Sequence, residues 1–168
     1  MSNVAEHVIG SDKIALTVHV VGIADVDLRR AQAVLDARKG KDLANPEVWA
    51  KTQLFNDYRE MLDTVKPDCV FIGVPPLFHG QATEGRNIEL ECIKRGVHCF
   101  IEKPISVQHP KEMIRDGLVK EMAKAEESGV IVSVGYMFRY SQGVNKIKEE
   151  LAKHFKGKAT FIGYSGTD

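Results

Sequence analysis

The sequence predicts an α/β protein built on a doubly wound parallel sheet. Short runs of apolar, β-branched residues recur along the chain, and segments with helical periodicity separate them. The runs are apolar throughout, as in strands that helices cover on both faces. Strands that alternate with helices form parallel sheets through right-handed crossovers. We therefore expect Val20, Val70, Phe100 and Val132 on adjacent or near-adjacent strands that end at one edge.

The first strand is predicted over residues 17–24, where the run TVHVVGIA stops at Asp25. A helix should follow over residues 28–39, because its apolar residues recur with helical spacing and Gly40 supplies a stop. The polar loop after it contains Pro46, which favours a short helical turn.

A short second strand is predicted at Gln53–Phe55, and either Asn56 or Asp57 should cap the helix that follows. That helix has its apolar residues at the spacing i, i+3, i+4 and i+7. They are Tyr58, Met61, Leu62 and Val65. The next strand spans residues 69–74, and Pro75 and Pro76 end it.

The rest of the chain continues the alternation of helix and strand. The expected elements are a helix over residues 81–95, a strand over 97–101, a helix over 110–128, a strand over 130–134, a helix carrying Val144, Ile147 and Leu151, and a strand from residue 159. No internal repeat or long linker interrupts the sequence.

Composition excludes several classes of function. Lys plus Arg and Asp plus Glu each number 23 among 168 residues, so the net charge is zero and nothing indicates a nucleic-acid or membrane partner. No apolar run reaches the roughly 20 residues that span a bilayer. The three cysteines, Cys69, Cys92 and Cys99, show no metal-ligand spacing, so we expect no metal site, buried reduced thiols and a cytoplasmic protein.

Chemistry-bearing residues gather where four of the strands end. They are Asp25, Pro75 and Pro76 with His79, Glu102 and Lys103, and the segment from Tyr136 to Arg139. The carboxyl edge of an open parallel sheet is where ligands bind, so these residues could meet one elongated ligand.

Lys103 offers the most specific chemistry of this group. Its ammonium could bind a substrate hydroxyl and stabilise the negative charge that develops on that oxygen as hydride leaves. The alternative is an exposed Glu102–Lys103 pair before a turn, which would contribute little free energy. Likewise, ordinary strand termination would also explain Pro75 and Pro76, and His79 could be an ordinary polar loop residue.

Asp25 ends a strand that would lie next to the first nucleotide-binding strand. A carboxylate at that position can accept hydrogen bonds from both hydroxyls of the adenosine ribose of a dinucleotide. Either Asp25 or Asp27 could instead cap the next helix. A carboxylate repels a 2′-phosphate, so we expect NAD rather than NADP, although Arg29 and Arg30 leave NADP open.

The ordered motifs ADVD, VPPLFH, EKP and GYMFRY resemble the nucleotide-binding, Rossmann-like domain of the Gfo/Idh/MocA oxidoreductases over residues 20–140. These enzymes use NAD or NADP on sugars, inositols and related polyols. The resemblance implies that Asp25 binds the ribose and that Pro75, Pro76 and His79 line the cofactor. It places Glu102 and Lys103 beside the nicotinamide, with Lys103 in contact with the substrate. It places Arg139 near the nicotinamide ribose or the substrate. It also implies a cis bond before Pro104.

Two features of the family are not found in the sequence. Residues 1–20 contain no GxGxxG turn, the motif that cradles the pyrophosphate, and the chain ends where the substrate domain would open. We therefore expect a fold truncated at both ends, with residues 1–158 forming a partial dinucleotide-binding domain and 159–168 the start of a substrate domain. A shortened gene product, an incomplete gene model and one domain of a larger protein all fit this pattern.

Three functions follow as hypotheses. The first is an NAD(P)-dependent oxidoreductase, or a fragment of one, acting on a sugar, inositol or polyol. The second is a non-catalytic dinucleotide-binding or regulatory protein, and the third is an inactive globular fragment. Without the pyrophosphate cradle, we expect this chain alone to be inactive and its NAD binding to be absent or no tighter than millimolar, a free energy of about −4 kcal/mol or weaker. Unpaired strand edges further predict self-association.

Overall fold

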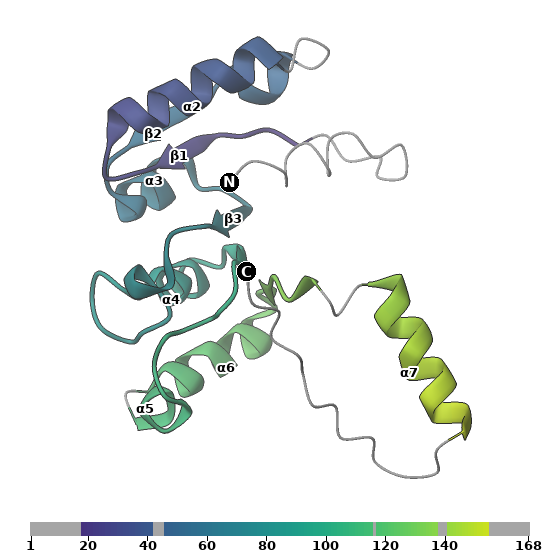
Figure 1. The fold of residues 1–168 in the computed structure, drawn as a ribbon. Coiled ribbons are helices and arrows are strands. Elements are labelled where there is room, and N and C mark those ends of the chain that lie inside the picture. Colours follow the sequence, from purple (N-terminus) through teal and green to yellow (C-terminus); the bar gives the residue numbers. More distant parts are fainter. Residues whose placement is uncertain (1–17, 42–45, 116, 138–140, 155–168) are drawn as a thin grey trace. The chain divides into compact units, whose positions relative to one another are not determined.

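The computed structural model describes residues 18–41, 46–115, 117–137 and 141–154, in which helices and strands alternate (Figure 1). The strands are β1 (Gly22–Ala24), β2 (Gln53–Phe55), β3 (Cys69–Ile72), β4 (His98–Ile101) and β5 (Val132–Val134). The helices are α2 (Leu28–Lys41), α3 (Tyr58–Val65), α4 (Ile88–Lys94), α5 (Pro110–Arg115), α6 (Leu118–Ser128) and α7 (Gln142–His154), with 3₁₀ helices at Pro46–Trp49 and Pro76–Phe78.

Every strand pair that the structure describes is parallel, which confirms the predicted α/β class. The strands form two sheets, β1-β2 and β3-β4-β5, and no described ladder joins β1 to β3. The single sheet that we expected is therefore divided.

Three apolar clusters form the core. The largest lies around β3, β4 and α4 and contains Leu62, Ile72, Ile88, Cys92, Val97, Cys99 and Ile101. A second joins α4 to α6 through Leu90, Ile93, Leu118, Ala125 and Val130. The third, beneath α2, contains Leu35, Val48 and Trp49. Burial of these side chains is the main favourable term in folding.

Helix α3 connects the two sheets. It contacts β1, β2 and α4. On one side Met61 fills the space that the missing side chain of Gly22 leaves open, since a Cβ there would lie 2.9 Å from the Met61 Cγ. On the other side Leu62 enters the largest core cluster. Asp57, rather than Asn56, caps this helix by accepting a hydrogen bond from the Arg59 amide at 2.7 Å.

Two predicted helices are shorter than expected. The helix predicted from residue 81 begins at Ile88, because Gln81 and Arg86 close a loop with their own backbone hydrogen bond and Gly85 adopts φ +80°. The helix predicted over 110–128 is divided into α5 and α6 near Gly117, at φ +87°. A positive φ is incompatible with a continuous right-handed helix. Conversely, α2 passes through Gly40, its predicted stop, to Lys41.

Strand β3 is not covered on both faces as its composition predicted. Phe71 is 46% exposed and lies 5.7 Å, centroid to centroid, from Phe100 on β4. Cys69 is also exposed, whereas Cys92 and Cys99 are buried thiols whose pKa burial raises to about 12. The expectation of buried thiols therefore fails for Cys69.

The described chain divides after Val134 into two compact units. The second contains α7, on which Val144 and Leu151 are half-buried and Ile147 is 53% exposed. The strand expected from residue 159 lies outside the described residues. Among the described helices, none has the length and apolarity that a bilayer crossing requires.

Candidate cofactor site

Lys103 lies directly beyond the carboxyl end of β4. The Glu102 amide donates to the Ile72 carbonyl at 3.0 Å, so the ladder with β3 continues one residue past the strand. The Lys103–Pro104 bond is cis, as the resemblance implied. Glu102 and Lys103 are both exposed, and within the described residues the Lys103 ammonium has no ion-pair partner. The structure describes no ion pair between Glu102 and Lys103, and the exposure of both residues fits either interpretation of Lys103.

The loop after β3 lies at the same edge as Lys103, because β3 and β4 are parallel and in register. Pro75 and Pro76 open a 3₁₀ turn, which the Phe78 amide closes by donating to the Pro75 carbonyl at 2.9 Å. Two apolar side chains on this turn, Leu77 and Phe78, are 58% and 56% exposed. The turn thus presents a rigid, apolar surface at the carboxyl end of the sheet.

His79 ends this loop in the interior of the protein. Its side chain is 1% exposed, and its Nδ1 lies 2.6 Å from Oε1 of Glu89, which is 0% exposed. In this position the imidazole makes no direct contact with solvent. It would act on a cofactor through the loop that it anchors.

Gly80 holds the β3 loop against the segment that follows Lys103. It adopts φ +71°, and a Cβ there would lie 1.9 Å from the Ile105 carbonyl oxygen. No residue with a side chain fits such an approach. The two loops at this edge therefore touch through their backbones.

Asp25 follows β1, and its carboxylate is engaged by Arg30. Arg30 Nε donates to Oδ2 at 2.9 Å, and Arg30 Nη2 donates to Oδ1. These charge-assisted bonds lower the pKa of Asp25 below its ordinary value of 3.8, assisted by the Asp27 amide. The cap is Asp27, because its Oδ1 accepts from the Arg29 and Arg30 amides. Asp27, and not Asp25, is therefore the residue that caps α2.

The fourth strand end is only partly visible. Tyr136 and Met137, which follow β5, are 46% and 80% exposed. Arg139, expected near the nicotinamide ribose or the substrate, lies outside the described residues. The structure thus brings Pro75, Pro76, Glu102 and Lys103 to one sheet edge. Asp25 belongs to the other sheet.

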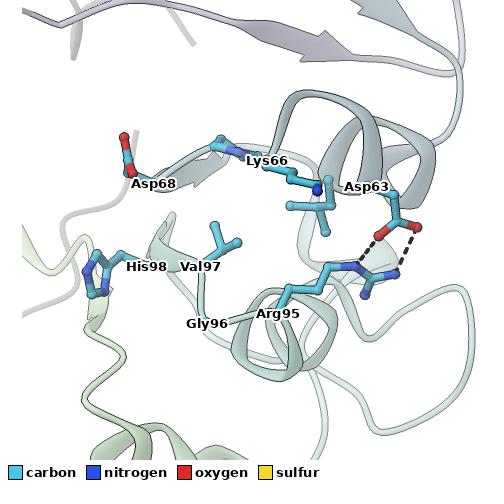
Figure 2. Close-up of a pocket in the computed structure, with 9 residues that line it drawn as sticks. Asp63, Lys66, Asp68, Arg95, Gly96, Val97 and His98 are labelled. Carbon is cyan, nitrogen blue, oxygen red and sulfur yellow. Dashed lines mark hydrogen bonds and ion pairs between the residues drawn. The ribbon is translucent and has the colours of Figure 1, made fainter.

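An open hollow, which no motif in the sequence indicates, lies at the opposite edge of the β3-β4-β5 sheet (Figure 2). It has a volume of about 380 Å³ and lies where β3 and β4 begin. Its lining residues are Leu62, Asp63, Lys66, Pro67, Asp68, Arg95, Gly96, Val97 and His98. Ligands of open parallel sheets bind at the carboxyl ends of the strands, so we place the cofactor site there and not in this hollow.

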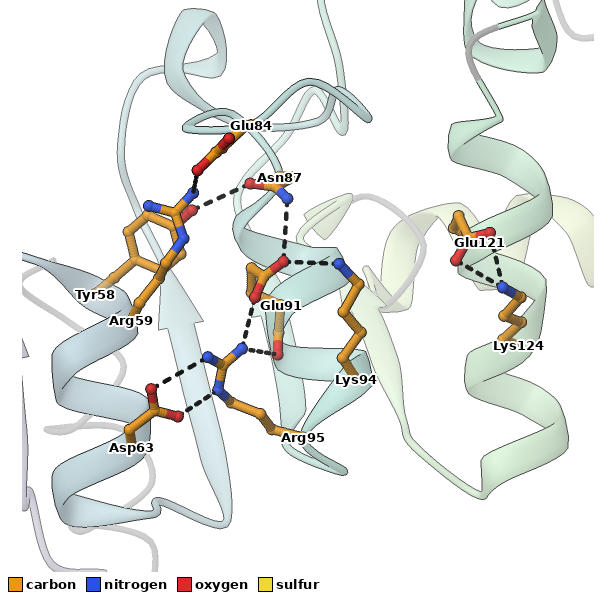
Figure 3. Close-up of polar contacts among 10 residues, drawn as sticks. All are labelled: Tyr58, Arg59, Asp63, Glu84, Asn87, Glu91, Lys94, Arg95, Glu121 and Lys124. Carbon is orange, nitrogen blue, oxygen red and sulfur yellow. Dashed lines mark hydrogen bonds and ion pairs between the residues drawn. The ribbon is translucent and has the colours of Figure 1, made fainter.

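A charge network links α3 to α4 beside the hollow (Figure 3). Arg95 donates to Asp63 at 2.7 Å and to Glu91 at 2.6 Å, and Lys94 donates to Glu91 at 2.9 Å. Tyr58 donates to Asn87 at 3.2 Å. Lys94 and then Arg95 lower the pKa of Glu91, Arg95 lowers that of Asp63, and both carboxylates raise that of Arg95. The network is structural, because its charged groups neutralise one another.

Comparison with known proteins gives a consistent result. A family model described as "Oxidoreductase family, NAD-binding Rossmann fold" (GFO_IDH_MocA) matches residues 3–136. The chain is 36% identical over 126 residues to the uncharacterized protein UNK4.17 of Schizosaccharomyces pombe, a match that covers 70% of this chain and 30% of that protein. It is 24% identical over 152 residues to D-glucoside 3-dehydrogenase of Escherichia coli, covering 90% and 40%.

A solved structure agrees with these sequence matches. Myo-inositol 2-dehydrogenase from Lactobacillus plantarum superimposes with a TM-score of 0.61 and 26% identity, covering 92% of this chain and 38% of that one. The chain spans 30–40% of the length of the curated relatives that it matches.

Proposed function

The chain belongs to the Gfo/Idh/MocA oxidoreductase family, and we propose that it forms the NAD(P)-binding part of an enzyme that transfers hydride between a nicotinamide and a sugar, inositol or related polyol. The observation that carries this proposal is the exposed Lys103 ammonium, which has no ion-pair partner in the described chain and stands at the carboxyl end of β4. Inositol and sugar dehydrogenases among the similar proteins support the substrate class.

The described residues fit a dinucleotide. Asp25 would accept hydrogen bonds from the adenosine ribose, since among the described residues its Oδ2 receives one hydrogen bond, from Arg30 Nε, and has a second lone pair. Pro75 and Pro76 would lie along the cofactor, and His79 would hold their loop from within. Glu102 and Lys103 would lie beside the nicotinamide, with Arg139 near its ribose or the substrate. When bound, the nicotinamide accepts or donates the hydride.

Lys103 would act on the substrate oxygen. Its ammonium would donate a hydrogen bond to the hydroxyl that is oxidised, or to the carbonyl that is reduced, and would stabilise the negative charge that develops on that oxygen. Such an interaction is stronger in the transition state than in the ground state, so it accelerates the reaction and does not merely bind substrate.

We propose NAD as the preferred cofactor. The Asp25 carboxylate disfavours a 2′-phosphate, while Arg30, 62% exposed, could turn toward one. Because the sequence contains no Gly-rich pyrophosphate turn, this chain alone should bind NAD no tighter than millimolar.

The test is the substitution Lys103→Ala in an active chain, made by joining this segment to the flanking sequences of a catalytic relative. We expect kcat with a sugar or inositol to fall about a hundredfold to a thousandfold, while the cofactor Kd changes less than about threefold. Lys111→Ala, an exposed lysine of α5, is the matched control and should leave both unchanged. Intact turnover with a weakened cofactor Kd would make Lys103 a cofactor contact only.

A further inference from the structure

The most deeply buried polar groups of the described chain are His79 and Glu89. Both residues are 0% exposed, and their Nδ1 and Oε1 atoms are 2.6 Å apart. Their remaining polar atoms, His79 Nε2 and Glu89 Oε2, have no hydrogen-bond partner among the described residues. Burying such groups is costly even when they pair, and an apolar pair of equal volume often serves stability as well or better. Stability alone therefore does not explain why this pair is here.

The location of the pair suggests another role. His79 is the residue that ends the 3₁₀ turn after β3. Glu89 lies in the first turn of α4, and α4 packs against both β3 and β4. Their contact therefore ties the loop at the carboxyl edge of the sheet to a helix that the core holds in place.

Gly80, the residue after His79, contacts the neighbouring loop that follows Lys103. Gly80 packs on the Ile105 carbonyl and lies close to Ser106 Cα, with ideal Cβ distances of 1.9 Å and 2.9 Å. Ile105 is two residues beyond Lys103. A shift of His79 would therefore move Gly80 into, or away from, the segment that carries Lys103.

We propose that His79 and Glu89 are positioning residues that set the place of Lys103 at the sheet edge through the contact of Gly80 with Ile105. Neither side chain touches cofactor or substrate in this role. Only the consequence for Lys103 chemistry depends on the proposed function; the mechanical link between the pair and the Lys103 segment is a property of this chain alone.

The test uses the 168-residue chain with both residues replaced by leucine, His79→Leu with Glu89→Leu. Two amides report on the loops: Phe78, which donates to the Pro75 carbonyl at 2.9 Å, and Gln108, which donates to Ser106 Oγ at 3.0 Å. We expect the urea midpoint to be retained, since no buried polar group is left unpaired. We expect hydrogen exchange at both reporter amides to be at least tenfold faster and the Lys103 amide resonance to shift.

A third amide, Val130, which donates to the Ala125 carbonyl at 2.9 Å beyond the end of α6, should keep its exchange rate. The matched control is Glu121→Gln, which removes the exposed Lys124 ion pair and should change neither reporter. If the double variant keeps wild-type exchange and an unshifted Lys103 resonance, the pair only fills the core and the proposal fails.

A second variant, Glu89→Gln, keeps the shape of Glu89 and replaces its carboxyl group with an amide, so it serves if the double variant does not fold. The proposal requires altered His79 ring ¹⁵N resonances together with a shifted Lys103 amide. Altered ring resonances with an unshifted Lys103 would overturn it. NAD-induced shifts at Lys103 should also diminish in either variant. Absence of any NAD effect on the wild type would count against the proposed function, while the exchange measurements would still decide the positioning role.

Discussion

At the scale of single residues, the sequence identified the strand-end groups but not their partners. Asp25 and Lys103 are recognisable because each follows an apolar run directly. The engagement of Asp25 by Arg30 depends on side-chain geometry within the first turn of α2. The His79–Glu89 contact was hidden because a helix was expected from residue 81, which left no loop to fold His79 back onto Glu89.

The Arg30 contact makes a residue-scale prediction. In Arg30→Ala, the pKa of Asp25 should rise toward its ordinary value of 3.8, because the largest cause of its lowering is removed. Carboxylate ¹³C resonances followed through a pH titration measure this. Arg29→Ala is the control, since Arg29 pairs with Asp27 and not with Asp25. An unchanged Asp25 titration in Arg30→Ala would show that the pair does not form in solution.

The same variant bears on cofactor preference. Without Arg30 the Asp25 carboxylate stands alone against a 2′-phosphate, so the ratio of NAD to NADP affinity should rise. Equal affinities for both dinucleotides in Arg30→Ala would contradict the assignment of Asp25 to the ribose.

At the scale of secondary-structure elements, hydrophobic spacing located α2, α3 and the described strands, but β1 begins at Gly22, five residues after its predicted start. The errors have identifiable causes. A glycine at positive φ divides α5 from α6, and hydrogen bonds within a loop delay the start of α4. Apolar spacing continues across both breaks, so it could not reveal them. The exposure of Phe71 depends on what lies beside β3, which composition does not encode.

Two glycines allow a matched test of the α5–α6 break. A Cβ at either Gly40 or Gly117 meets no atom within 4 Å, so only backbone conformation distinguishes them. Gly40→Ala, in helical α2, should stabilise by about 0.5–1 kcal/mol. Gly117→Ala, at φ +87°, should destabilise by about 1–2 kcal/mol. Urea unfolding measures both, and effects of the same sign would refute the break.

The charge network predicts a pH dependence. Glu91 and Asp63 have pKa values below their ordinary 4.5 and 3.8 in the folded chain. Lowered carboxyl pKa values stabilise the folded state above the unfolded values, and that stability is lost as pH falls through the folded values. The free energy of unfolding should therefore decline from about pH 5 downward.

Arg95→Ala should reduce this decline and lower the free energy of unfolding near neutral pH, because Arg95 lowers the pKa of Asp63 and, after Lys94, that of Glu91. Lys111→Ala, which removes an exposed cation of α5 that pairs with no carboxylate among the described residues, is the control. If Arg95→Ala retains the full acid dependence in urea titrations, the network is not its source.

At the scale of the whole molecule, the division between β1 and β3 is the main departure from the expected single sheet. Each of these strands has one strand partner in the described residues. Self-association through an unpaired strand edge therefore stays a prediction. Helix α3 and the Arg95 network then carry the connection between the two sheets.

The central claim, that the cofactor binds at the carboxyl ends of the strands, is tested most directly by titrating ¹⁵N-labelled chain with NAD to about 10 mM. The account predicts amide shifts at Asp25, Glu102 and Lys103 that rise without saturating below the millimolar range, and that weaken in Asp25→Ala but not in Asp36→Ala. NAD-induced shifts at Lys66 and His98, around the hollow where β3 and β4 begin, in place of shifts at Asp25, Glu102 and Lys103, would contradict it.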